Sequence, residues 1–282
     1  MHYGQPPSWR PDVEQLSVEG HRGTVRDALG GLRNLEQLLG SLRVGPRALL
    51  SVIPDVQACC APLAAALSGL ANSVASRLTE AGPIVSRLST MASERVAALS
   101  DAFDGIGKST FNAKARLRLE EQVVSTGRDL EAVYDLIDLL GEVAWGRTMP
   151  ISLAEIAREA FRSSEPPGLA KSSIRLTLCA EIPNIERVVS PRAIVLILNQ
   201  LVRWSIRKTP DLVPRVVFGM SGDNGVEVRV EAESGTGELR WAIGRYSLPE
   251  AEECLRIAAR AMKLELERSD GSEQLRLLFP ST

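Results

Sequence analysis

The sequence predicts an α+β protein, in which an N-terminal helical bundle or hairpin is followed by an α/β sandwich with a mixed sheet. Three observations lead to this class. Apolar residues recur every three or four positions over most of residues 22–145, as in helices that pack on helices. Alternating apolar residues and glycine-containing turns begin only after Gly146. Aromatic residues make up 4 % of the chain, so we expect cores of aliphatic side chains.

The composition argues against several classes of protein. With 282 residues, 44 % of them apolar, the chain can build two cores and is not disordered. A net charge of −2 argues against a nucleic-acid-binding protein. We expect no membrane span, because no apolar run approaches roughly 18–20 residues. Four cysteines without metal-ligand spacing, and an N-terminus without a signal-peptide core, predict free thiols, no metal site and a cytoplasmic location.

Breaks at Gly82-Pro83 and Gly146 divide the chain into segments. The first residues are rich in proline, glycine and polar side chains, and the following helices match no family that we can name. The division is a flexible tail over 1–20, N-terminal helices over 21–82, a helical dimerisation hairpin over 83–147 and an α/β domain over 148–282. Within 21–82, Gly45-Pro46 marks a turn, and Pro54 and Pro62 leave the start of the second helix uncertain.

The helix expected over residues 119–144 has a strict heptad spacing of apolar residues. Such a repeat needs a partner helix along its whole length. That partner is either another helix of a monomeric bundle or a second copy of the chain. We predict the second copy, with two hairpins joined in a four-helix homodimer. The predicted dimer seam consists of Leu99, Phe103, Val123, Leu130, Val133, Ile137 and Leu140.

The elements expected after Gly146 alternate between helices and strands. Ser152 and Glu155 form a capping-box pattern that predicts a helix leading into IAREAF and ended by Pro166-Pro167-Gly168. A turn is expected at Pro183-Asn184 and a hairpin turn over 221–225. The remaining expected elements are strands near 174–178, 216–220, 226–230 and 274–279, and helices over 191–207 and 249–262.

Several stretches, in their order and spacing, resemble sensor histidine kinases over residues 84–282. PISLAEIAREAF is similar to the entry into their ATP-binding domain, and SPRAIVLILNQLVRWSIRKTP is similar to the helix that carries the N box. GVEVRVEAESGTG resembles the strand and loop of their D-x-G-x-G motif, and LRIAARAMKLELE resembles their closing helix. The resemblance implies a GHKL-type ATPase fold after a dimerisation and phosphotransfer hairpin.

The motifs depart from the family pattern where the nucleotide should bind. The two N-box asparagine positions fall on Gln200 and Trp204, and Trp204 has no oxygen to offer a magnesium ion. The adenine-binding aspartate maps to Glu233, or to Ala232 in another register. Gly235 and Gly237 follow, but the lid and the second glycine-rich turn are missing. The resemblance therefore implies a degenerate pocket, and we expect no cofactor.

The phosphoacceptor is also missing. Aligning ASERVAAL with the H box of the family places Ser93 where the histidine should be, followed by Glu94. Chain-wide, no histidine follows His21, so the hairpin cannot carry a phosphohistidine. A serine phosphate is a stable ester and would not replace it. We therefore expect no catalytic residues and no enzymatic activity, that is, a pseudokinase.

The predicted function is that of a non-catalytic scaffold or regulator of bacterial two-component signalling. We expect it to bind a partner protein, such as a receiver domain, through Ser93, Glu94, Val96 and Ala97. Two alternatives stay open. One is a divergent ATPase or kinase of the same superfamily, for which Gly235 and Gly237 would supply nucleotide contacts. The other is an unrelated structural adaptor protein.

Overall fold

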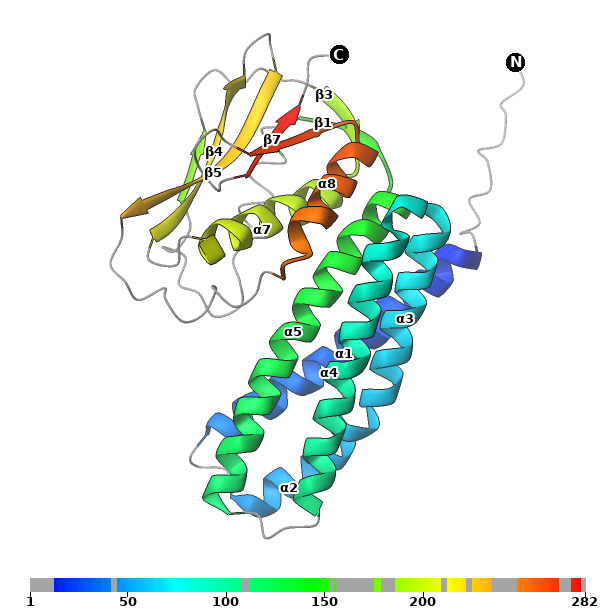
Figure 1. Cartoon of the computed structure of the whole chain (residues 1–282), viewed down its shortest axis with the longest axis vertical. Coiled ribbons are helices and arrows are strands. Elements are labelled where there is room, and N and C mark those ends of the chain that lie inside the picture. Colours follow the sequence, from blue (N-terminus) through cyan, green and yellow to red (C-terminus); the bar gives the residue numbers. More distant parts are fainter. Residues whose placement is uncertain are drawn as a thin grey trace, which may run out of the picture.

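The protein consists of a long helical bundle and a smaller α/β domain that lies against one end of it (Figure 1). The structure is a computed structural model that describes residues 13–41, 45–107, 112–152, 155, 175–178, 186–208, 212–221, 225–234, 248–268 and 275–279. The described elements confirm an α+β protein in which long helices precede the sheet.

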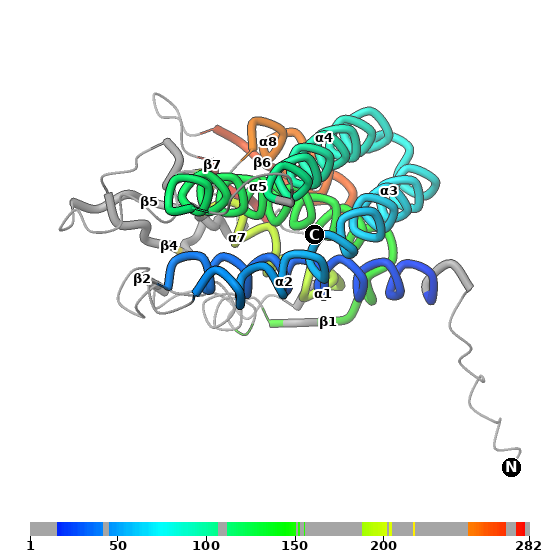
Figure 2. Tube along the Cα trace, turned by 90° about the horizontal axis from the view of Figure 1, so that it is seen from below, coloured from blue at the N-terminus to red at the C-terminus, as the bar shows by residue number. Residues whose placement is uncertain are grey.

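Four long helices form the bundle. They are α1 (Val13–Gly40), α3 (Cys60–Arg77), α4 (Gly82–Gly107) and α5 (Ala113–Trp145). In the chain, α2 (Pro46–Ala58) lies between α1 and α3, and the short 3-10 helix η1 (Thr79–Ala81) lies between α3 and α4. Helix α5 contacts α1, α3 and α4, and α3 also contacts α1 and α4. Seen from below, α1 and α2 lie along one edge of the bundle (Figure 2).

Helix α1 begins inside the segment that was expected to be a flexible tail. It starts at Val13, and Val18 is buried one turn before the region in which the first helix was predicted. Val18 continues the apolar face of Val25 and Leu29, because residues four and seven positions apart lie on one side of a helix. The predicted tail over 1–20 is therefore too long by several residues.

The second predicted helix is two helices that meet at Cys59. Pro54 lies within α2, and Pro62 is the third residue of α3, where a missing N–H leaves no intrahelical hydrogen bond unmade. By length and composition, Pro46–Arg77 could cross a membrane, with a mean hydropathy of 1.5, which corrects the expectation that no such stretch exists. In the structure, Leu63, Leu67 and Leu70 of this stretch are buried in the bundle.

The heptad seam is buried inside a single chain. Each of its seven side chains is at most 2 % exposed, and so is Leu119 at the beginning of the same row. Helices α1 and α3 of the same chain pack against α5, so they occupy the place that the sequence analysis assigned to a second hairpin. A second copy is therefore not required to bury the seam. Dimerisation itself stays a prediction.

The α/β domain contains a five-stranded mixed sheet with the strand order β2-β4-β5-β7-β6. Strands β2 (Arg175–Leu178) and β4 (Leu212–Ser221) are parallel, and the other neighbours are antiparallel. The other strands of this sheet are β5 (Gly225–Ser234), β6 (Glu265–Arg268) and β7 (Leu275–Phe279). In β7, Leu275, Leu277 and Phe279 are buried and alternate with half-buried residues, as the period of two requires.

Two helices of this domain lie between the sheet and the bundle (Figure 1). Helix α7 (Pro191–Lys208) contacts β4, β5 and α5, and helix α8 (Ala251–Ala261) contacts β6, α7 and α5. Ser190 caps α7, since its Oγ accepts a hydrogen bond from the Ala193 N–H at 3.3 Å, and Pro191 follows at the first helical position. The predicted helices over 191–207 and 249–262 are confirmed.

A second, two-stranded sheet was not predicted. Strand β1 (Met149–Ser152) pairs antiparallel with β3 (Glu186–Val189). Ser152, which was expected to cap a helix, ends β1, and the helix predicted after it lies mostly outside the described residues, as does the turn at Pro183-Asn184. Helix α5 ends at Trp145 and β1 begins at Met149, on either side of the predicted domain boundary at 147.

Candidate functional site

The exposed face of α4 carries three of the four predicted partner-binding residues. Ser93, Glu94 and Ala97 are exposed, and the neighbouring Ala98 is exposed as well. The Ser93 hydroxyl donates a hydrogen bond to the Ser89 carbonyl at 3.0 Å, so it is tied to its own helix. The structure therefore brings these three residues together on one accessible surface.

Val96 does not belong to that surface. Its side chain is 5 % exposed and lies in the same core as Leu99 and Phe103. Val96 follows Ala92 by four residues and precedes Leu99 by three, which is the spacing of the buried face of α4. The prediction that Val96 contacts a partner is wrong, because the bundle already occupies its side chain.

The two predicted N-box positions lie one turn apart on α7 and are both buried. Gln200 is 2 % exposed, and Trp204 is 6 % exposed and belongs to the hydrophobic core. Glu233 lies in β5, where it pairs with Val213 of β4. Gly235 and Gly237 lie outside the described residues. The structure thus places Gln200 and Trp204 together and leaves the glycine pair untested.

Acidic side chains surround the beginning of α8. Glu252 accepts hydrogen bonds from Arg256 and Arg268, with its nearest contact to Arg268 Nη2 at 2.6 Å, and Glu253 forms an ion pair with Arg87 of α4 at 2.5 Å. The hydrogen bond from Arg268 lowers the pKa of Glu252, and Arg256 adds to this effect against the opposing effect of burial. The first turn of α8 therefore carries negative charge, and arginines of the protein are its partners.

His21 lies on α1 rather than on the hairpin of α4 and α5. Its ring packs against α3, since a β-carbon built at Gly69 would lie 2.5 Å from His21 Nε2. Nε2 thus faces a neighbouring helix at close distance.

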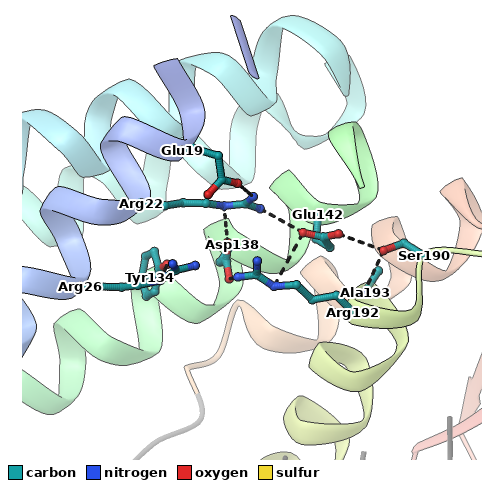
Figure 3. Close-up of polar contacts among 9 residues, drawn as sticks. All are labelled: Glu19, Arg22, Arg26, Tyr134, Asp138, Glu142, Ser190, Arg192 and Ala193. Carbon is teal, nitrogen blue, oxygen red and sulfur yellow. Dashed lines mark hydrogen bonds and ion pairs between the residues drawn. The ribbon is translucent and has the colours of Figure 1, made fainter. Parts of the chain in front are cut away.

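A polar cluster that the sequence analysis missed joins the bundle to the α/β domain (Figure 3). We call it the shared-carboxylate cluster, and it consists of Arg22 from α1, Asp138 and Glu142 from α5, and Ser190 and Arg192 at the start of α7. Arg22 Nε lies 2.7 Å from Asp138 Oδ1, and Arg22 Nη2 lies 3.3 Å from Glu142 Oε2. From the other side, Arg192 Nη2 lies 2.8 Å from Asp138 Oδ2.

Ser190 completes the cluster from the α/β domain. Its Oγ donates a hydrogen bond to Glu142 Oε1 at 3.0 Å while it accepts the capping bond of α7. The side chains of Arg22 and Asp138 are both 5 % exposed, so their charges are removed from water. Burial alone would lower the pKa of Arg22, but Asp138, Glu19 and Glu142 together raise it above its usual value.

Further ion pairs cross the same junction. Arg203 of α7 pairs with Asp135 of α5, and Arg260 of α8 pairs with Glu80 of η1 at 3.4 Å. Arg203 is thus paired with a carboxylate of the same chain.

The sequence does contain a signal for the missed cluster. Arg22 lies four residues after Val18 and three before Val25, so it stands at a buried position of the α1 seam. Asp138 and Glu142 continue the row of Tyr134 on a second face of α5. A charge at a buried helical position predicts a buried partner, but a single sequence does not say which carboxylate that partner is.

The comparisons with known proteins give likenesses in structure only. No family model matches the chain, and no curated protein matches it in sequence. The histidine kinase AdeS of Acinetobacter baumannii is 13 % identical with a TM-score of 0.40, and the match covers 65 % of this chain and 92 % of that chain. The Erythrobacter litoralis EL346 blue-light activated histidine kinase is 15 % identical with a TM-score of 0.29, over 67 % and 63 % of the two chains.

A structure titled as a bacterial phosphotransferase is 13 % identical with a TM-score of 0.36, over 72 % of this chain and 96 % of that chain. This chain is thus similar to histidine kinase structures. The TM-scores are all below 0.5, so we draw nothing about activity, ligands or partners from them.

Proposed function

We propose that this protein is a non-catalytic, histidine-kinase-like regulator that acts by binding another protein. The observation that carries the proposal is the burial of Gln200 and Trp204 on α7, at the positions that the resemblance assigns to the N box. An asparagine at these positions would hold the magnesium ion of the nucleotide. An indole in the apolar core offers that ion no oxygen and fills space with a large side chain.

The beginning of α8 supports the same proposal. In the family that the sequence resembles, a glycine-rich turn cradles phosphates before this helix. Here Glu252 and Glu253 stand at the helix start and pair with arginines of the protein itself. Further negative charge from a triphosphate would be repelled at this position.

Calorimetry with ATP and magnesium tests the absence of nucleotide binding. We expect no heat of binding at micromolar to millimolar ATP, and no rise of the melting temperature, because a ligand stabilises a folded protein only when it binds it. A one-to-one binding isotherm would overturn the non-catalytic proposal and favour the divergent ATPase instead.

The exposed face of α4 is the partner-binding surface that we propose. Ser93 and Ala97 lie one turn apart on it, and Glu94 and Ala98 lie beside them, so the surface is made of small residues with one carboxylate. Small side chains let a partner approach the helix closely. A receiver domain is the partner that the resemblance implies.

Substitution of Ala97 by arginine tests this surface. We expect Ala97→Arg to reduce capture of purified receiver domains at least about tenfold, because a long charged side chain blocks close approach. Ala65→Arg is the matched control, since Ala65 is an exposed alanine on α3. Equal binding by wild type and Ala97→Arg, with both proteins folded, would refute α4 as the docking surface. If only Ala65→Arg lost binding, the docking surface would lie on α3 instead of α4.

A further inference from the structure

The shared-carboxylate cluster joins three helices that lie far apart in the sequence (Figure 3). Asp138 and Glu142 of α5 each face two guanidinium groups, that of Arg22 from α1 and that of Arg192 from α7. We propose that this cluster is a latch. Through it, the α/β domain stays docked on the bundle only while α1 is packed against α5. The latch does not rest on the proposed function, and it would act whichever partner the protein binds.

The two arginines differ in their access to water. The side chain of Arg22 is 5 % exposed, whereas that of Arg192 is 43 % exposed. Without Arg22, two buried carboxylates would share one guanidinium, and a buried carboxylate without its partner is strongly destabilising. Water can reach the two carboxylates most readily from the exposed side of Arg192. The cluster should therefore open where the beginning of α7 lies against α5.

The connection between the domains runs directly beside the cluster. Gly146 is the C-cap residue of α5, and its N–H donates a hydrogen bond to the Glu142 carbonyl at 2.6 Å. A β-carbon at Gly146 would lie 2.7 Å from Ser190 Oγ. Because Ser190 both caps α7 and binds Glu142, a movement of Glu142 disturbs the first turn of α7 and the chain that enters β1.

Coupling of this kind works in both directions. If packing of α1 against α5 raises the equilibrium constant for docking of the α/β domain, then docking must raise the equilibrium constant for packing of α1 by the same factor. A signal that displaces α1 would release the domain, and release of the domain would loosen α1 around Arg22. The state of the N-terminal helix would thereby be transmitted to the opposite end of the chain.

Hydrogen exchange on the full chain tests the latch from the side of α1. In Arg22→Met we expect exchange to rise about tenfold over residues 190–198 of α7 and over 146–149, with the buried turns of α3 and α4 unchanged. Arg33→Met is the control for removing a charge from α1, because Arg33 also pairs α1 with α5, through Glu131 at 2.5 Å, but its side chain is 53 % exposed and lies outside the shared-carboxylate cluster. We expect Arg33→Met to leave exchange in α7 unchanged. Protected α7 in Arg22→Met would overturn the latch.

The reciprocal variant tests the latch from the side of the α/β domain. Arg192→Met should raise exchange in α1 over residues 18–25, even though Asp138 and Glu142, with which Arg192 pairs, both lie on α5. Arg203→Met is its control, because it removes another pair between α7 and α5, through Asp135. Unchanged exchange in α1 in Arg192→Met would overturn the latch. Because Arg192 is half exposed, this variant decides the question even if Arg22→Met fails to fold.

Discussion

Gly127 and Gly146 lie within and just after the same helix, α5, but a β-carbon would meet different surroundings at each. At Gly127 it would have no atom within 4 Å, whereas at Gly146 it would clash with the Glu142 carbonyl oxygen and lie 2.5 Å from Glu142 Oε1 and 2.7 Å from Ser190 Oγ. We expect Gly127→Ala to raise the free energy of unfolding by about 1 kcal/mol, because alanine favours a helix interior. We expect Gly146→Ala to lower it by roughly 1–3 kcal/mol through overpacking.

Urea denaturation followed by circular dichroism measures both effects, and each variant serves as the control of the other. The backbone at Gly146 is extended with φ −61°, so alanine is tolerated there by conformation, and a loss of stability would come from the contacts. A Gly146→Ala protein as stable as wild type would contradict the close packing of Gly146 against Glu142 and Ser190.

At the scale of elements, the long periodic helices and the strands β2, β4, β5 and β7 could be predicted, whereas β1, β3 and β6 could not. The heptad spacing of Leu119 to Leu140 identified α5, because it repeats over many turns. Strands β1, β3 and β6 have four residues each, with at most two large aliphatic side chains, whereas the alternating Ile174, Leu176 and Leu178 indicated β2. The break between α2 and α3 at Cys59 carries no glycine or proline of its own.

Ile137 tests whether the α5 seam holds the bundle together within one chain. Its side chain is 1 % exposed. We expect Ile137→Asp to cost several kcal/mol and to unfold the bundle, because it buries a carboxylate without a partner. Ile137→Val is the control and should cost only about 0.5–1.5 kcal/mol. Thermal unfolding of the two variants is the measurement. An Ile137→Asp protein that melts like wild type would show that the seam is not a packed core.

At the scale of the whole molecule, the sequence predicted the order of the two parts but not how they contact each other. Of the candidate site, Ser93, Glu94 and Ala97 are accessible as predicted, whereas Val96 is not, because its exposure depends on which helices pack around α4. The cluster around Asp138 was missed for the same reason. Glu142 lies 120 residues after Arg22 and 48 residues before Ser190, and periodicity within one helix does not reveal such a meeting.

The mass of the protein in solution tests whether the protein is a single chain or a homodimer. The sequence analysis predicted a homodimer, because the α5 seam needs partner helices. In the structure, α1 and α3 of the same chain supply them, and Leu130, Val133 and Leu140 are completely buried without a second copy. A dimer through this seam would require α1 and α3 to leave the bundle and Arg22 to leave two buried carboxylates, which is costly. The predicted homodimer must therefore form through a face of the bundle other than the seam, and light scattering tests it against the mass of a single chain, 30.6 kDa. Twice that mass would support the homodimer, and the mass of one chain at all concentrations measured would refute it.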